Sequence, residues 1–92
     1  VLLDLRKAED YEADHVDGFV SADVDAAKNG DIENGVEQLK KATEGEDLEN
    51  KKILLMCYSG AGYAQVGTDL LINEMGVNPE NIYTVEGGMK AW

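Results

Sequence analysis

The sequence contains one cysteine and one histidine, and this scarcity excludes two common ways of stabilising a small domain. A single cysteine cannot form a disulfide within the chain. Cys57 and His15 together cannot supply the ligands of a structural zinc site. We therefore expect no metal and no cofactor. A lone thiol suits a reducing compartment, which favours the cytoplasm.

Long apolar runs and basic residues are also scarce. No stretch approaches the roughly 18 consecutive apolar residues of a membrane-spanning helix. Eight Lys and Arg stand against nineteen Asp and Glu, which gives a net charge of -11. This charge repels nucleic-acid phosphates and anionic lipids, so neither nucleic acid nor membrane is an expected partner.

What the chain does contain is an alternation of short apolar runs and helical patterns over a length suited to one domain. Strands are expected at residues 1–5, 19–24, 52–57 and 81–85. Helices are expected at residues 7–15, 32–43, 63–76 and from 89 onward. A loop is expected from the end of the second strand to about residue 31. This order predicts a three-layer α/β fold whose parallel strands are buried on both faces and whose ligands bind at the carboxyl ends of strands.

The spacing of apolar residues predicts which helix faces are buried. In the first helix, Ala8, Tyr11 and His15 would face the core. In the second, Ile32, Val36 and Leu39 would do so, with Thr43 as a further candidate.

Cys57 stands at the end of the strongest strand, before a loop of mostly small residues. The loop comprises Tyr58, Ser59, Gly60, Ala61, Gly62 and Tyr63. Curled before a helix, its backbone N–H groups would converge on one point and favour an anion there, such as a thiolate nucleophile. The alternative is that Cys57 is an inert apolar filler under a turn.

Cysteine-dependent phosphatases use a comparable loop, but they require an Arg six residues after the cysteine to grip the phosphate. That position is Tyr63 here, and no Arg or Lys occurs in residues 58–72. The loop is therefore unlike that of a phosphatase or an arsenate reductase, and neither activity is the leading interpretation.

Four motifs, in order along nearly the whole chain, resemble the rhodanese-like family. VLLDLR at residues 1–6 resembles its strand ending in Asp-x-Arg, and EDYEADHVDGFV at residues 9–20 resembles its Glu-x-x-x-x-His-x-x-Gly-Ala region, with Phe19 in place of Ala. KILLMCYSGAGYAQ at residues 52–65 resembles the active-site strand and loop. NIYTVEGGMKAW at residues 81–92 resembles the closing strand, Gly-Gly and Trp.

This resemblance implies a parallel sheet of about five strands with helices on both faces. It also implies a sulfurtransferase in which Cys57 carries a sulfur atom as a persulfide held by loop amides, without a metal. Family domains usually extend further at each end, so we expect residues 1–92 to be a single domain trimmed at both ends. Such a piece would expose apolar surface.

The expected partners are a small sulfur donor or a protein-bound persulfide, and an acceptor thiol or cyanide. Members that use small anionic donors well often carry basic residues in the loop, where this chain has Tyr58 and Ala61 or Gly62. We therefore expect weak use of thiosulfate and favour a neutral or protein-bound persulfide.

Other marked residues have simpler structural interpretations. Asp4 and Arg6 are expected to form structural hydrogen bonds or an ion pair, and His15 to tie the turn at residues 17–18 to the sheet. The resemblance does not make His15 a catalytic base. Gly87 and Gly88 are also interpreted as structural, because glycine allows two backbone segments to approach closely. Trp92 is interpreted as covering an edge of the core.

Several alternatives stay open. Either hydroxyl of Tyr58 and Tyr63 could contact a donor, or Tyr63 could pack inward, and Ser59 could bind the persulfide or merely form the turn. The rival to a sulfurtransferase is a catalytically weak or inactive rhodanese-like module used for protein contact. A redox-sensing thiol is a third interpretation, although it lacks a resolving cysteine in this segment.

Overall fold

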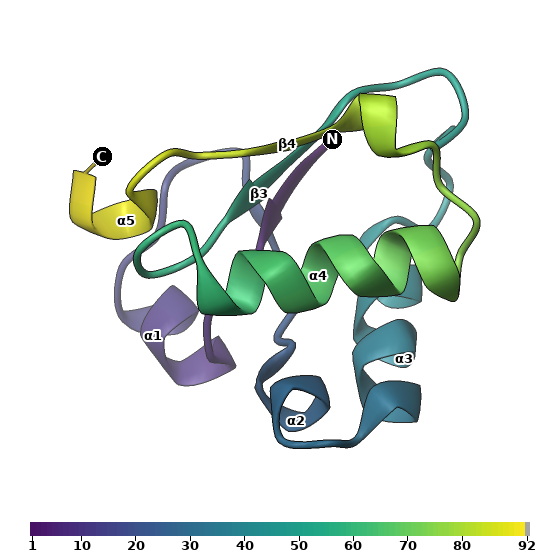
Figure 1. The fold of residues 1–92 in the computed structure, drawn as a ribbon. Helices are drawn as coiled ribbons and strands as arrows, with labels where there is room; N and C mark the ends of the chain where they lie inside the picture. Colours follow the sequence, from purple (N-terminus) through teal and green to yellow (C-terminus); the bar gives the residue numbers. More distant parts are fainter. Residues whose placement is uncertain (92) are drawn as a thin grey trace.

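A four-stranded parallel sheet forms the centre of the computed structural model, which describes residues 1–91 (Figure 1). The strands are β1 (Leu2–Asp4), β2 (Val20–Ser21), β3 (Ile53–Met56) and β4 (Ile82–Thr84), in the order β2-β1-β3-β4. The predicted α/β class with a parallel sheet is confirmed. The described residues contain four strands rather than five, because only four segments of this sequence have the apolar pattern of a strand. Trp92 lies outside the described residues.

Helices connect the strands, and a last short helix follows β4. They are α1 (Ala8–Ala13), α2 (Asp25–Lys28), α3 (Ile32–Ala42), α4 (Gly62–Asn73), the 3-10 turn η1 (Pro79–Asn81) and α5 (Gly88–Ala91). The loop predicted before residue 31 is wrong, because α2 forms there. The side chain of Asp23 accepts a hydrogen bond from the Asp25 amide at 2.8 Å, and two alanines follow that favour a helix.

One face of the sheet packs against α2, α3 and α4. Leu3 and Leu55 from the strands join Leu39 of α3 and Leu71 of α4 in one buried cluster. Gly35 lets these helices approach closely, since a Cβ there would lie 2.5 Å from the Cβ of Ala27 on α2. The core thus holds the start of α4 at a defined place beside the end of β3.

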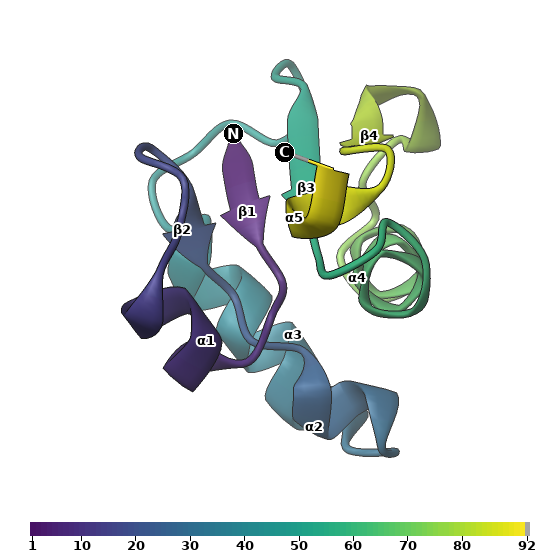
Figure 2. The same cartoon turned by 90° about the vertical axis from the view of Figure 1, so that its left-hand side faces the viewer.

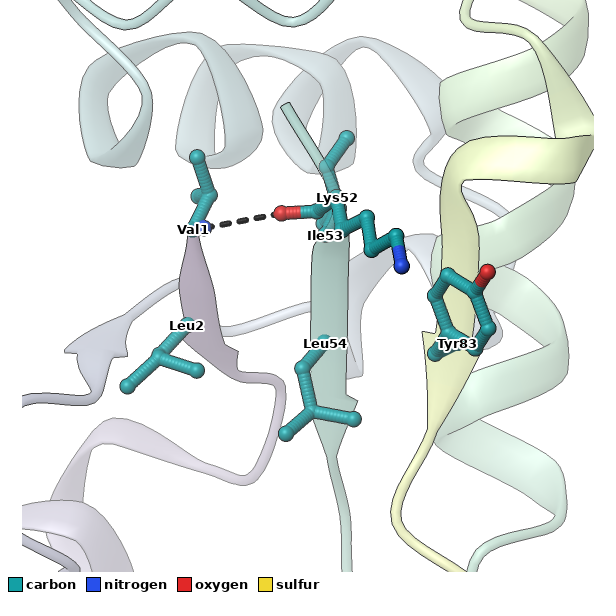
Figure 3. Close-up of a pocket in the computed structure, with 6 residues that line it drawn as sticks. All are labelled: Val1, Leu2, Lys52, Ile53, Leu54 and Tyr83. Carbon is teal, nitrogen blue, oxygen red and sulfur yellow. Dashed lines mark hydrogen bonds between the residues drawn. The ribbon is translucent and has the colours of Figure 1, made fainter. Parts of the chain in front are cut away.

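The opposite face of the sheet is largely open, with α5 in front of the carboxyl end of β3 (Figure 2). Leu2 and Tyr83 are 36% and 47% exposed, so the expectation that the strands are buried on both faces is wrong for this part of the sheet. A shallow hollow of about 380 Å³ lies between them (Figure 3), lined by Val1, Leu2, Lys52, Ile53, Leu54 and Tyr83. The exposed apolar surface expected of this segment is therefore present.

Helix α1 does not bury the face predicted for it. It contains no buried residue, and both Ala8 and His15 are exposed. The six-residue helix is held through its polar groups, because the Tyr11 hydroxyl donates to the Phe19 carbonyl at 2.6 Å. Ile32, at the start of α3, is also 43% exposed, whereas Leu39 is buried as predicted.

Candidate active site

Cys57 directly follows β3, and its side chain is turned into the loop that leads to α4. The residue is only 1% exposed. Its Sγ accepts a hydrogen bond from the backbone amide of Gly60 at 3.1 Å. Gly60 has a φ of 78°, a left-handed conformation that glycine adopts without strain, and this turns its amide back towards the sulfur.

A second loop, residues 85–88, packs its backbone directly against the first. A Cβ on Gly88 would lie 2.3 Å from the Cys57 carbonyl oxygen, and one on Gly60 would lie 2.9 Å from the Gly87 nitrogen. The amide of Met89 donates to the Cys57 carbonyl at 2.8 Å, and that of Lys90 to the Tyr58 carbonyl at 3.2 Å. The structural role predicted for Gly87 and Gly88, close backbone approach, is confirmed.

The remaining amides of the Cys57 loop are available to a ligand. Within residues 1–91, five of them donate no hydrogen bond: Tyr58, Ser59, Ala61, Gly62 and Tyr63. The last two belong to the first turn of α4, where helical amides have no intrahelical acceptor and favour negative charge. Ser59, Ala61 and Gly62 are exposed, so this part of the loop faces solvent.

Tyr58 stands on one side of the loop, tied to the segment after β1. Its hydroxyl donates to the carboxylate of Asp10 on α1 and accepts from the Lys7 amide at 3.2 Å. Burial, followed by the hydrogen bond to Asp10, raises the pKa of Tyr58 to about 12. The phenol therefore stays protonated at physiological pH.

Tyr63 stands on the other side, with its ring edge-to-face against that of Tyr58 at a centroid distance of 5.3 Å. Its hydroxyl donates to the carboxylate of Asp25 on α2, and this hydrogen bond, together with burial, raises the pKa of Tyr63 above its usual value. Both tyrosines are half-buried. They link the loop to α1 and α2, and each hydroxyl already donates its proton to a carboxylate.

Asp4 and Arg6 form a buried ion pair at the end of β1. The Arg6 Nη2 lies 2.9 Å from Asp4 Oδ2, and its Nε lies 3.0 Å from Asp4 Oδ1. The same Nη2 donates to the Asp14 carbonyl at 2.6 Å, which fixes the end of α1. The Arg6 guanidinium also lies 5.9 Å from the centroid of the Tyr58 ring. The pair thus supports the loop from the sheet side.

His15 does not hold the turn at residues 17–18 to the sheet. Its Nδ1 donates to the Tyr11 carbonyl at 2.7 Å, and its ring stacks on the Tyr11 ring at 3.9 Å. Because the side chain is exposed and lies beside α1, its contacts stabilise the end of that helix instead.

Three charged residues that the loop sequence could not indicate also meet at this site. Asp10, Asp25 and Lys28 come from α1 and α2, between 29 and 47 positions before Cys57 in the chain. The ammonium of Lys28 lies 5.6 Å from the centroid of the Tyr63 ring. Their spacing carries no local signal, because tertiary packing brings them to the loop: Asp10 through α1 and its bond with Tyr58, and Asp25 and Lys28 through α2.

Two kinds of feature were not found among the described residues, a cluster of metal-binding side chains and a membrane-spanning helix. Across positions 1–91, no group of three or more His, Cys, Asp or Glu side chains is placed to hold a metal ion. Within the same range, no helix has the length and apolar character needed to cross a membrane.

Comparison with known proteins gives one result. The family model described as the rhodanese-like domain matches residues 1–92, the whole chain. No curated protein matched the sequence, and no solved structure did.

Proposed function

Because the chain belongs to the rhodanese-like domain family, we propose that it is a sulfurtransferase that carries a sulfane sulfur as a persulfide on Cys57. The observation that supports this most strongly is the hydrogen bond from the Gly60 amide to Cys57 Sγ, inside a loop whose other amides have no acceptor among residues 1–91. An inert filler would need no such donors. A sulfur anion is stabilised by them.

The proposed reaction has two displacement steps. The Cys57 thiolate attacks the outer sulfur of the donor, and a bond forms between Sγ and that sulfur. The donor's own sulfur–sulfur bond breaks, and the leaving group keeps the electron pair of that bond. Thiosulfate releases sulfite. A hydropersulfide releases a thiolate, which takes up the proton of the former S–H group and leaves as a thiol. An acceptor thiolate or cyanide then attacks the terminal sulfur and releases the Cys57 thiolate. The transfers balance without an external oxidant or reductant.

The loop amides provide the electrostatic part of the mechanism. The terminal sulfur of the persulfide is negatively charged and extends beyond Sγ. The amides of Ser59, Ala61, Gly62 and Tyr63 are the donors proposed to hold it. Because Cys57 is 1% exposed, attack requires the loop to open, and the exposed residues Ser59 and Ala61 form its least packed part.

The charge around the loop favours a donor other than thiosulfate. The loop itself contains no Arg or Lys, and the tyrosines on its two sides are bonded to the carboxylates of Asp10 and Asp25. A dianion is repelled by such surroundings. We therefore propose a neutral or protein-bound persulfide as the better donor and a thiol as the acceptor, in a reducing compartment such as the cytoplasm.

Steady-state assays with two donors test this function. Wild type should transfer sulfur from a low-molecular-weight hydropersulfide to a thiol or cyanide acceptor, and only weakly from thiosulfate. Cys57→Ser should abolish both reactions, because its hydroxyl cannot form a persulfide. Asn73→Ala, at an exposed position at the far end of α4, serves as the control variant and should retain activity. Turnover in Cys57→Ser equal to that of wild type would contradict the proposal. Thiosulfate turnover matching hydropersulfide turnover would contradict the donor preference.

A further inference from the structure

Lys28 brings a positive charge to the side of the Cys57 loop, although the loop itself has none. The residue is the last of α2, and its ammonium lies 5.6 Å from the centroid of the Tyr63 ring. Its Cε lies 3.2 Å from where a Cβ on Gly62 would stand. The side chain therefore crosses the first turn of α4, and the absence of a side chain at Gly62 makes room for it.

The position of Lys28 is set by the core. Ala27, the preceding residue, is buried in the cluster with Leu70 of α4 and lies against Gly35 of α3. Helix α2 therefore has a fixed place beside α4, although the Lys28 side chain itself is exposed. The base of the lysine is rigidly placed, and its end can adjust to a ligand.

Within the described residues, the ammonium of Lys28 has no carboxylate partner. Ion pairs among residues 1–91 involve Arg6, Lys41 and Lys51, and Lys28 is in none of them. The neighbouring Asp25 carboxylate instead accepts the Tyr63 hydroxyl. A lysine held over an aromatic ring, with its donors unused, beside amides that also lack acceptors, has the chemistry to bind an oxyanion.

We propose that Lys28 binds the anionic group of the sulfur donor at the Cys57 loop and so determines how well anionic donors are used. This inference rests on the proposed sulfur transfer at Cys57. In this proposal, Lys28 supplies from α2 the positive charge that a basic residue within the loop would otherwise supply. Because Asp25 lies on the same short helix, the single lysine only partly offsets the acidic surroundings, so thiosulfate should be used weakly rather than not at all.

The test compares donors that differ in charge. Thiosulfate is a dianion that carries oxyanion groups, whereas the hydropersulfide of 2-mercaptoethanol carries none and is attacked by a thiolate in its protonated, uncharged form. The rate constant for adding sulfur to Cys57 is measured by intact mass spectrometry for wild type, Lys28→Gln, Lys28→Arg and Lys40→Gln. Lys40 is an exposed lysine on α3, so Lys40→Gln makes the same change in net charge away from the loop.

For Lys28→Gln we expect about a tenfold lower rate constant with thiosulfate and no change with the neutral donor. Lys28→Arg should keep most of the thiosulfate rate, and Lys40→Gln should match wild type. Added salt weakens the repulsion of the dianion in both proteins but also screens the attraction of Lys28, so it should raise the thiosulfate rate constant of wild type less than that of Lys28→Gln. A thiosulfate rate that is unchanged in Lys28→Gln, or an equal loss with both donors, would overturn the proposal.

A second measurement separates this inference from the proposed function. The rates at which anionic iodoacetate and neutral iodoacetamide alkylate Cys57 do not depend on sulfur transfer. The ratio of the iodoacetate rate to the iodoacetamide rate should fall in Lys28→Gln and stay at the wild-type value in Lys40→Gln. If wild type gains no sulfur from either donor but this ratio falls, the proposed function fails while the anion-binding role of Lys28 stands. An unchanged ratio, or no alkylation by either reagent, contradicts the role of Lys28.

Discussion

Gly88 lies directly against the backbone of Cys57, with no room for a side chain between them. A Cβ on Gly88 would stand 2.3 Å from the Cys57 carbonyl oxygen, and the next amide, that of Met89, donates to the same oxygen at 2.8 Å. Gly88 also has a φ of 59°. The loop around Cys57 is therefore shaped by backbone contact with the segment that follows β4.

Substitution of Gly88 should destabilise the domain and distort this loop. For Gly88→Ala we expect a loss of about 2–4 kcal/mol in the free energy of unfolding, because left-handed strain adds to a clash with backbone atoms that cannot move aside. Urea unfolding measures the change. Gly45→Ala is the control, since Gly45 has a φ of 82° but no atom within 4 Å of its would-be Cβ. Its loss should be about 1 kcal/mol. Equal losses in the two variants would contradict the close-contact role.

The Asp4–Arg6 pair should be costly to break from one side. In Asp4→Asn the buried guanidinium loses its counter-charge, and we expect a loss of about 3 kcal/mol in unfolding free energy. The exposed pair between Glu37 and Lys41, 3.7 Å apart, provides the control: Glu37→Gln should change stability by less than about 0.5 kcal/mol.

Replacing both members of the buried pair tests whether the loss comes from an uncompensated charge. The double variant Asp4→Leu with Arg6→Met should recover part of the stability lost in Asp4→Asn, because no unpaired charge is then buried. A double variant less stable than Asp4→Asn would show that the hydrogen bond from Arg6 to the Asp14 carbonyl is the more important contact.

Gly35 should resist replacement even though it lies inside a helix. Alanine is the better helix former by about 1 kcal/mol, but its Cβ would lie 2.5 Å from that of Ala27 and 2.7 Å from Leu70 Cδ1. We expect Gly35→Ala to be destabilising by about 1–2 kcal/mol, because overpacking outweighs propensity. Adding Ala27→Gly removes the facing methyl group and should restore part of the loss in thermal unfolding. A Gly35→Ala variant more stable than wild type would show that the helices can separate freely.

The Tyr58 hydroxyl should lose its proton at a higher pH than an ordinary tyrosine, and the domain should become less stable over that pH range. Its pKa in the folded protein is raised to about 12, against about 10 in an unfolded chain. Between these values the unfolded state releases the proton first, so stability is full below pH 10 and falls as pH rises from about 10 to 12. Tyrosinate absorbance, taken as the difference between wild type and Tyr58→Phe, should show this midpoint, and Asp10→Asn should lower it. A midpoint near 10 in wild type would contradict the hydrogen bond to Asp10.

Local sequence patterns predicted the strands and the Cys57 loop because these depend on neighbouring residues. The apolar run at residues 53–56 forms β3, and the small residues after Cys57 form the tight loop. Periodicity failed where burial depends on what covers an element. Leu2 lies in an apolar run that suits a strand buried on both faces, yet it is 36% exposed because little of the described chain covers its side of the sheet.

The charges around the site could not be predicted for a related reason. The sequence correctly shows a loop without Arg or Lys, but the cation beside it comes from α2, a segment expected to be irregular. Only the packing of α2 against α3 and α4 places Lys28 next to Gly62. In the same way, the carboxylates that bind Tyr58 and Tyr63 are distant in sequence, and many other acidic residues were equal candidates.

The most direct test of sulfur carriage at Cys57 is intact mass spectrometry of the domain after exposure to a hydropersulfide, followed by an acceptor thiol. Wild type should gain the mass of one sulfur atom and then lose it to the thiol. Peptide analysis should place the added sulfur on the peptide that contains Cys57. Cys57→Ser should gain nothing under the same conditions. If folded wild type gains no sulfur from either a hydropersulfide or thiosulfate, Cys57 is not a sulfur carrier and the domain is better explained as a binding module.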